Sequence, residues 1–393
     1  MDKSLPLSGL RVLDLTSVIY GPYATQVLGD FGADVIKIEP PEGDMVRDIG
    51  PARNPKMSAL FLGSNRNKRS LVLDLKRTTD KKALWRLIDG ADVFAHNMRP
   101  NKIVALGFDP DAVLAHNPRI IYGGLHGYRE DGPYAGMPAY DDVIQGQSGL
   151  VGAFMARDGE PALMPTIIAD KTAALLASNG IMAAIIRRGI TGKGGYVETS
   201  MFEGMVGYVL LEHQHGAAFV PPLGETGYPR TLSPHRRPHS TTDGYICMLA
   251  YTDKQWQQFW KLSGQPEISD DLRFIDVGAR AQNVDALYEL AGDALAKRTT
   301  GEWLSLLRDA EVPAGPVNRL EDLRDDVHLN AIDFFKTFEH PTEGKIEVID
   351  TPYRFERESL PLHRHHPQLG EHSREVLAEA GLSEAEIIAI VEG

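Results

Sequence analysis

Leu10-Arg11-Val12-Leu13-Asp14-Leu15 and, after a helix-length interval, Asp34-Val35-Ile36-Lys37-Ile38 are the two stretches that decide the fold of this chain. Both are short and largely apolar, as buried strands are, and the residues between them from Pro22 to Phe31 have a helical pattern. A strand, a helix and a second strand in this order predict parallel pairing of the two strands. The chain is therefore expected to open with a βαβ unit.

The same alternation continues beyond this unit. Further short strands are expected at 70–73, 93–95 and 120–122, separated by helix-length stretches such as 81–88. Strands that alternate with helices are typical of a parallel sheet covered by helices on its faces. The first part of the chain is thus predicted to be α/β and Rossmann-like.

The second half of the chain changes character. A long helix, apolar on all sides and therefore buried, is expected at 170–188. After a segment rich in Pro, Gly, Arg and His at 221–238, a strand at 244–249 and a helix from Asp253 are expected, and a strand at 345–349 and a helix from Ser383 close the chain. We predict a large Rossmann-like domain from 1–220 together with 330–393, a small α+β domain at 225–328, and linkers near 196–242 and 323–335.

Composition excludes several classes of protein. A net charge of −13 over 393 residues disfavours a nucleic-acid binder, which needs net or clustered positive charge. The only cysteine, Cys247, excludes an internal disulfide. No long apolar run or signal-like N-terminus is present in this sequence, so the expectation is a cytoplasmic enzyme without a membrane or nucleic-acid partner.

Two alternative sites are weak. The first strand–helix turn, Thr16-Ser17-Val18-Ile19-Tyr20-Gly21-Pro22, lacks the G-x-G-x-x-G spacing of an NAD site. His363, His365, His366 and His372 show no metal-binding spacing, and a solvated basic loop is the better interpretation. We therefore expect neither NAD nor a metal, and the absence of G-x-S-x-G disfavours a serine nucleophile.

Asp170 is the strongest chemical candidate. It follows Pro165-Thr166-Ile167-Ile168-Ala169 and precedes the long apolar helix. Aspartate is a favoured N-cap residue, and a carboxylate at a helix start can stay ionised near neutral pH and attack an activated acyl group. From the residues alone, both interpretations stay open.

The chain as a whole resembles the family III CoA-transferases, a group that includes formyl-CoA, carnitine and bile-acid CoA-transferases and the related acyl-CoA racemases. The resemblance spans nearly the whole length, and its motifs occur in order: Gly9-Leu10-Arg11-Val12-Leu13-Asp14-Leu15, Gly32-Ala33-Asp34-Val35-Ile36-Lys37-Ile38-Glu39, Asn67-Lys68-Arg69-Ser70, Leu73-Asp74-Leu75-Lys76, Asn97-Met98-Arg99-Pro100, Ala139-Tyr140-Asp141-Asp142-Val143-Ile144-Gln145 and Leu369-Gly370-Glu371-His372-Ser373.

The resemblance implies a fold, a co-substrate and a chemistry. The fold would be a ring-shaped chain in an interlaced homodimer, and coenzyme A would be the co-substrate. Asp170 would attack an acyl-CoA donor to give a mixed anhydride, and the released CoA thiolate would convert it to an aspartyl-CoA thioester. A small carboxylic acid would then accept the CoA.

The resemblance also implies site residues. Tyr140 stands where these transferases place an active-site tyrosine. The matching motifs supply cations and an apolar wall for CoA, and we expect it to be bound by Ile19, Lys37, Leu73, Lys76, Asn97, Met98, Arg99 and His126. Lys68 and Arg69 are either further CoA cations or a solvated turn.

Departures from the family narrow the reaction. Formyl-CoA members carry glutamine where this chain has Ile19, and a glycine-rich loop that we do not find here. Racemases need a histidine base at Tyr140, and a tyrosine cannot remove an α-proton near pH 7. A 2-methylacyl-CoA racemase, a formyl-CoA:oxalate-type transferase and a non-catalytic CoA-binding module remain the alternatives.

The acceptor is expected to be a small dicarboxylate such as itaconate, mesaconate, citramalate or malate, with succinyl-CoA as donor. Arg236 and Arg237, with Arg230 close by in sequence, are cations suited to a free carboxylate. Arg236 and Arg237 are predicted to bind the substrate.

Overall fold

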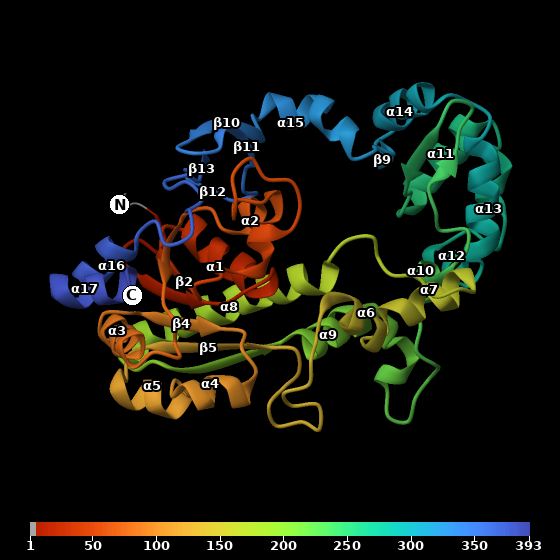
Figure 1. Cartoon of the computed structure of the whole chain (residues 1–393). Coiled ribbons are helices and arrows are strands. Elements are labelled where there is room, and N and C mark those ends of the chain that lie inside the picture. Colours follow the sequence, from red (N-terminus) through yellow and green to blue (C-terminus); the bar gives the residue numbers. More distant parts are fainter. Residues whose placement is uncertain (1–4) are drawn as a thin grey trace. The chain divides into compact units, whose positions relative to one another are not determined.

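The computed structural model describes residues 5–393, which form two compact units (Figure 1). Unit 1 comprises the chain up to Ser148, Met164–Tyr208 and Asp333–Gly393, and unit 2 comprises Gly149–Leu163 and Val209–Ile332. The sequence-based division had kept 149–163 with the large domain. In the structure this segment packs with unit 2, because its helix contacts the short helix at Pro229–Leu232.

A six-stranded, fully parallel sheet forms the centre of unit 1, with strand order β3-β2-β1-β4-β5-β6. This order confirms the prediction of an α/β, Rossmann-like fold. The sixth strand was not predicted, because its residues are mostly half-buried and lack a continuous apolar run. The strands are β1 (Arg11–Leu15), β2 (Asp34–Glu39), β3 (Lys68–Val72), β4 (Val93–His96), β5 (Ile121–His126) and β6 (Gly195–Ser200).

Side-chain alternation along the strands gives the sheet two different faces. Leu13 and Leu15 belong to a buried cluster with residues of α3, α4, α5, α16 and α17. On the other face, α8 packs along α1 and touches β5 and β6 (Figure 1). The helices of unit 1 are α1 (Tyr20–Asp30), α2 (Ala59–Ser64), α3 (Thr78–Asp89), α4 (Pro100–Leu106), α5 (Pro110–His116), α6 (Asp141–Gln147), α8 (Ile168–Thr191), α9 (Met201–His213, ending in unit 2), α16 (Ser373–Glu379) and α17 (Glu384–Val391).

The helix predicted at 170–188 is α8, which runs from Ile168 to Thr191. Among the described helices it alone is long and apolar enough to cross a membrane by length and composition. Its residues Ala173, Ala177 and Ile181 are buried, which is the pattern of a helix that packs on a sheet. The small alanine side chains allow α1 to lie close along it.

The C-terminal part of unit 1 adds two antiparallel hairpins before the final helices. The predicted strand at 345–349 is confirmed as the second strand of the first hairpin, and the predicted closing helix begins directly after its N-cap, Ser383. The strands are β10 (Phe335–His340), β11 (Gly344–Ile349), β12 (Arg354–Phe355) and β13 (Glu358–Ser359).

Unit 2 is a small three-stranded antiparallel sheet packed with helices around its own core. Trp256, Phe259, Trp260 and Trp303 dominate this core and are each at most 5% exposed. The elements are α7 (Leu150–Asp158), α10 (Pro229–Leu232), β7 (His239–Ser240), β8 (Tyr245–Met248), α11 (Asp253–Ser263), α12 (Val277–Gln282), α13 (Val284–Leu295), α14 (Thr300–Asp309), β9 (Ala314–Pro316) and α15 (Val327–Ala331).

Candidate active site

A cavity of about 180 Å³ in unit 1 opens at the carboxyl ends of three parallel strands. Ser17 follows β1, Asn97 follows β4 and His126 ends β5, and all three line it. The strands β1 and β4 are neighbours although the chain leaves β1 towards β2 on the opposite side, so this is the topological switch point of the sheet. Ligands of open parallel sheets bind at this point.

A second cavity of about 320 Å³ lies at the ends of β1, β2 and β3. Leu73 and Lys76, two of the residues predicted to bind CoA, line it, and Lys102 adds a further cation to its wall. Ser17 and Met98 line both cavities. The two cavities therefore adjoin along one edge of the sheet.

Asp170 lines the first cavity from the first turn of α8. The helix begins at Ile168, and its N-cap residue, Ile167, makes no capping hydrogen bond. Instead Asp141, the first residue of α6, accepts hydrogen bonds through Oδ1 from the backbone amides of Ala169 (2.7 Å) and Asp170 (3.0 Å). The interpretation of Asp170 as the helix cap is wrong, because Asp141 already performs that task.

The Asp170 carboxylate consequently remains available. It is 9% exposed and accepts no hydrogen bond from any side chain or amide in the part of the chain that the structure describes. Burial, and secondly the negative charge of Asp141, raise the pKa of Asp170 to about 7. The sequence analysis expected a carboxylate that stays ionised near neutral pH, whereas this pKa leaves a large fraction protonated there.

Two tyrosines flank this carboxylate in the cavity wall. Tyr20, at the start of α1, donates a hydrogen bond to the Thr199 carbonyl (2.8 Å), and burial together with Asp170 and Glu198 raises its pKa. Tyr140 lines the same cavity and is 62% exposed. Tyr20 is fixed by its bond to β6, while Tyr140 is free to meet a substrate.

His126 lines the first cavity and lies beside the carboxylate of Glu130. Its Nε2 lies 3.2 Å from Glu130 Oε1, and the Tyr196 hydroxyl donates to Glu130 Oε2 (2.9 Å). Burial lowers the pKa of His126, and Glu130 offsets this only in part. The imidazole is therefore mainly neutral near pH 7, and it offers the cavity a hydrogen-bonding group without a fixed charge.

Asn97 lines the first cavity and also connects two loops by hydrogen bonds. Its side chain accepts from the Ser17 amide (3.0 Å) and donates to the Ser17 carbonyl (2.8 Å). These two bonds tie the loop after β4 to the loop after β1. Met98 and Arg99, which follow Asn97, also line the first cavity.

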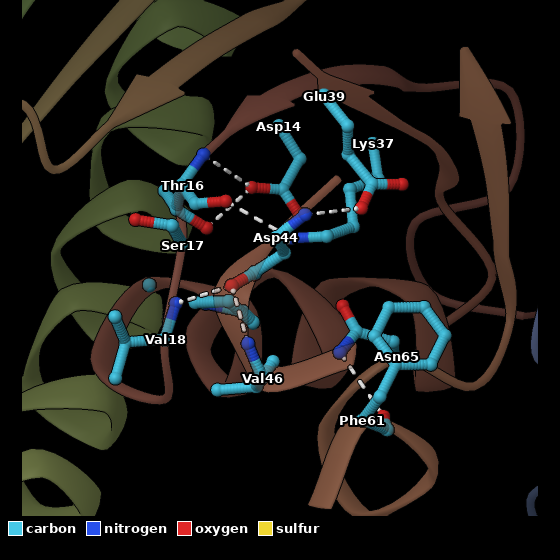
Figure 2. Close-up of polar contacts among 12 residues, drawn as sticks. Asp14, Thr16, Ser17, Val18, Lys37, Glu39, Asp44, Val46, Phe61 and Asn65 are labelled. Atoms are coloured by element: carbon cyan, nitrogen blue, oxygen red, sulfur yellow. Dashed lines mark hydrogen bonds and ion pairs between the residues drawn. The ribbon is translucent and has the colours of Figure 1, made fainter. Parts of the chain in front are cut away.

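Lys37 does not reach either cavity. It is fully buried, and its ammonium donates to Asp44 Oδ2 (2.9 Å) and to the Thr16 carbonyl (2.9 Å) (Figure 2). Its expected contact with CoA is therefore replaced by an internal ion pair. The pairing crosses from β2 to the loop that follows it, which the sequence motif does not reveal.

Asp44 shapes the turn that lines the cavity. Its Oδ1 accepts hydrogen bonds from the Val18 amide (3.1 Å) and the Val46 amide (3.2 Å) (Figure 2). Val18 has a φ of +70°, a left-handed conformation that is rarely adopted by a β-branched residue. The buried Lys37–Asp44 pair thus holds a strained turn at the mouth of the site.

Lys68 and Arg69 are buried in ion pairs, so neither proposed interpretation applies to them. Lys68 donates to Asp14 Oδ2 (2.9 Å), and burial lowers its pKa to about 8 although Asp14 opposes the shift. Arg69 donates to Asp34 and Glu379. Both residues connect β3 to neighbouring elements and leave no donor facing a ligand.

Ile19 is also turned away from the two cavities. It is 7% exposed and packs in a small apolar cluster with Val46, Met57 and Phe61. The two residues that precede it, Ser17 and Val18, line the first cavity.

Arg236 and Arg237 line a cavity of about 530 Å³ in unit 2, together with His239, Cys247 and Tyr288. Both arginine side chains are exposed, and only Arg237 makes a side-chain hydrogen bond among the described residues, to the Pro234 carbonyl (2.8 Å). They form an open basic surface without ion pairs to described carboxylates.

Two of the four histidines near the C-terminus are buried, since His366 is 1% and His372 9% exposed, whereas His363 is exposed. The Ser70 amide of β3 donates to His372 Nδ1 (3.3 Å). The prediction of a solvated loop is therefore wrong for His366 and His372. No group of three or more His, Cys, Asp or Glu suited to a metal ion occurs within residues 5–393.

Several residues that shape the site escaped the sequence analysis as functional: Ser17, Tyr20, Asp44, Glu130 and Asp141. Only Asp141 had a visible signal, because it lies in a family motif and begins a helix, but the helix that it caps starts almost thirty residues later. The others act through tertiary contacts that no local pattern displays.

The comparisons agree with this geometry. The model of CoA-transferase family III matches residues 7–373. The chain belongs to this family. As a family III CoA-transferase it uses a CoA thioester and a carboxylic acid as substrates.

Two relatives and a solved structure support the assignment of this chain to the family. It is 31% identical to succinyl-CoA:glutarate CoA-transferase of Mus musculus, covering 96% of this chain and 87% of the relative. It is also 31% identical to succinyl-CoA:mesaconate CoA-transferase of Haloarcula hispanica, covering 96% of both. A crystal structure of a CaiB/BaiF family protein from Brucella suis superposes with a TM-score of 0.79 at 31% identity, covering 96% of this chain and 99% of that one.

Proposed function

We propose that this CoA-transferase moves CoA from succinyl-CoA to a small dicarboxylic acid through covalent intermediates on Asp170. The observation that carries the proposal is the Asp170 carboxylate itself, which lines the first cavity without a hydrogen-bond partner among the described residues. Two relatives at 31% identity have names that combine succinyl-CoA with a dicarboxylate, glutarate or mesaconate.

The proposed reaction has two symmetrical halves. A carboxylate oxygen of Asp170 attacks the thioester carbonyl of the donor, forms a mixed anhydride and releases CoA as the thiolate. The thiolate attacks the Asp170 carbonyl, forms an aspartyl-CoA thioester and releases the donor acid. The acceptor carboxylate then attacks this thioester, forms a second mixed anhydride with Asp170 and releases the CoA thiolate. The thiolate attacks the acceptor carbonyl of this anhydride, which gives the acceptor thioester and releases Asp170 as a carboxylate. No proton is gained or lost overall.

The environment of Asp170 suits this chemistry. A partly buried carboxylate with a pKa near 7 is a better nucleophile than a well-solvated one, because it is held without strong hydrogen bonds. Asp141 accepts the hydrogen bonds of the backbone amides at the start of α8, so these donors do not bind the Asp170 carboxylate. Tyr140, which lines the cavity and is exposed there, would donate a hydrogen bond to an acyl oxygen.

The second cavity supports the binding of the CoA moiety. Lys76 and Lys102 provide cations for the phosphates, and Leu73 provides an apolar surface for the base. The thioester end would then reach Asp170 past Ser17 and Met98, which line both cavities.

Trapping the covalent intermediate tests the proposal. The protein is incubated with succinyl-CoA, treated with hydroxylamine or borohydride, and analysed by peptide mass spectrometry. We expect a modification on Asp170 that is absent in Asp170→Ala and present in Asp142→Ala, which removes an exposed carboxylate nearby. Glutarate, mesaconate or itaconate should discharge the unmodified aspartyl-CoA intermediate.

Two results would contradict the proposal. One is the absence of an adduct with succinyl-CoA and other acyl-CoA donors while CoA still binds. The other is exchange of the substrate α-proton with solvent deuterium without any acceptor acid, which would indicate a racemase.

A further inference from the structure

Besides the cavity of Arg236 and Arg237, unit 2 contains a cavity of about 360 Å³ that shares no lining residue with the cavity of Asp170. Four aromatic side chains contribute to its wall: Tyr228, Tyr251, Trp256 and Tyr288. Sites for small molecules are typically about 300 to 1,000 Å³, largely apolar, and carry a few polar groups. The cavity has the size and the wall of such a site.

Two arginines line this cavity, and they differ in their partners. Arg280 is 6% exposed, forms an ion pair with Asp253 and donates to the Phe274 carbonyl (2.9 Å). Its charge is therefore compensated inside the protein. Arg230 forms no ion pair with any carboxylate in the described residues.

Arg230 also has an unsatisfied donor. Its Nε is buried and has no hydrogen-bond partner in residues 5–393, and its guanidinium carbon lies 6.0 Å from the ring of Tyr228 and 5.9 Å from the ring of Tyr251. A buried donor without a partner destabilises the protein, because the loss of its hydrogen bonds to water is not offset. No aspartate or glutamate lines the cavity, although the chain as a whole has a net charge of −13.

We propose that this cavity binds a monocarboxylic acid with an aromatic ring or a similarly flat apolar body. The carboxylate would accept hydrogen bonds from the Arg230 guanidinium, whose planar set of donors matches it, and the ring would pack against Tyr251 and Trp256. The inference does not depend on the proposed function, since it rests on residues of unit 2 alone.

Calorimetric titration of the full-length protein tests the inference. Benzoate and phenylacetate are the probes, and benzyl alcohol is the uncharged control with the same ring. We expect saturable binding of both carboxylates and at least tenfold weaker binding of benzyl alcohol. Arg230→Met should weaken carboxylate binding tenfold or more, while Arg308→Met, which removes an exposed arginine elsewhere in unit 2, should leave it unchanged.

Tryptophan fluorescence locates the ligand independently of the Arg230 variant. The bound ring should quench emission from Trp256, and Trp256→Phe should remove this quenching while calorimetry still shows binding. The inference is overturned if neither carboxylate binds saturably, if Arg230→Met binds them as tightly as the unchanged protein, or if quenching persists in Trp256→Phe. None of these measurements uses a thioester, so they leave the proposed function to its own test.

Discussion

The two units of this CoA-transferase bury different kinds of side chain. The strand ends of unit 1 enclose a set of paired charges that includes Asp14, Lys37, Asp44 and Lys68, each at most 4% exposed. Within the described residues of unit 2, Arg280 is the one charged side chain that is buried. The core of unit 2 is aromatic and aliphatic. Apolar burial stabilises a unit without fixing fine geometry, whereas buried ion pairs have strict distances and orientations.

The location of the charges explains why unit 1 accepts them. The Lys37–Asp44 pair holds the Val18 turn, and Lys68 joins Asp14 to the Asn65 side chain (2.9 Å). These contacts lie directly behind the turn that lines the first cavity. We infer that unit 1 gives up part of its stability to hold this turn in one conformation, and that unit 2 has no comparable requirement.

The largest expected changes in stability come from replacing a buried charged residue of unit 1 or a buried aromatic residue of unit 2. Lys37→Met leaves Asp44 and Asp14 near one another without a full set of cations, and should lower the free energy of unfolding by about 3 to 5 kcal/mol. Trp303→Ala in unit 2 removes a fully buried ring and should cost a similar amount, about 3 to 5 kcal/mol. Urea denaturation of the full chain measures both changes.

The two variants should differ in function. Under conditions where both remain folded, Lys37→Met should slow formation of the Asp170 adduct, because the Val18 turn loses its support, and Trp303→Ala should not. The double variant Lys37→Met/Asp44→Asn keeps an acceptor for the Val18 amide and should recover part of the stability. Equal effects of Lys37→Met and Trp303→Ala on the adduct would remove the distinction between the units.

The second prediction is that replacing the proposed nucleophile, Asp170, makes the folded protein more stable at pH 8. Because the pKa of Asp170 is raised to about 7 in the folded state, the folded protein favours the protonated form. The stability associated with that proton is complete below the unfolded pKa of about 4 and is lost as the pH rises to about 7, by up to about 4 kcal/mol. Asp170→Asn does not titrate, so it should be more stable than the unchanged protein at pH 8 and similar at pH 4.

Thermal melting across this pH range provides the measurement. Asp142→Asn is the matched control, because it neutralises an exposed carboxylate and should shift the melting temperature little at any pH. A melting curve of Asp170→Asn that falls with pH in parallel with the unchanged protein would show that Asp170 is not a desolvated carboxylate.

A smaller effect should follow from changing the neighbour of the nucleophile. Asp141→Asn keeps an oxygen acceptor for the amides of Ala169 and Asp170 but removes the charge that helps to raise the pKa of Asp170. The rate of adduct formation in the unchanged protein should rise with pH around 7, and in the variant this midpoint should move down by about one pH unit. An unmoved midpoint would exclude the contribution of Asp141.

Asp141→Ala, which also removes the cap, should in addition cost about 1 to 2 kcal/mol of stability.

The smallest effect concerns the basic surface of unit 2. If Arg236 and Arg237 bind the free carboxylate of the acceptor, replacement of either by Ala should raise the KM for the acceptor about tenfold, or about 1.4 kcal/mol, while the KM for succinyl-CoA changes little. Their side chains are exposed, so the fold should not suffer. Steady-state kinetics with glutarate and mesaconate measures this effect. An unchanged acceptor KM in both variants would contradict the sequence-based prediction that these arginines bind the substrate.

The sequence by itself determined the parallel sheet and the candidate nucleophile. Apolar runs in β1, β2 and β4 and the helix-length intervals between them report local structure, because a buried strand needs a continuous apolar run wherever it sits. Asp170 was found because its motif and the apolar helix after it are contiguous in the chain. Leu73 and Lys76 were predicted as CoA contacts from the family resemblance, and both line the second cavity.

Only the tertiary structure decided what the charged residues do. Lys37 and Lys68 belong to motifs that suggest ligand contacts, yet their ammonium groups pair with carboxylates inside the protein. The partner of Lys37 is Asp44, in the loop after β2, and the partner of Lys68 is Asp14, on β1. The capping of α8 by Asp141 frees the Asp170 carboxylate in the same way. A sequence shows that a charge is present, but whether that charge is buried in a pair or left for a ligand depends on residues that folding brings together.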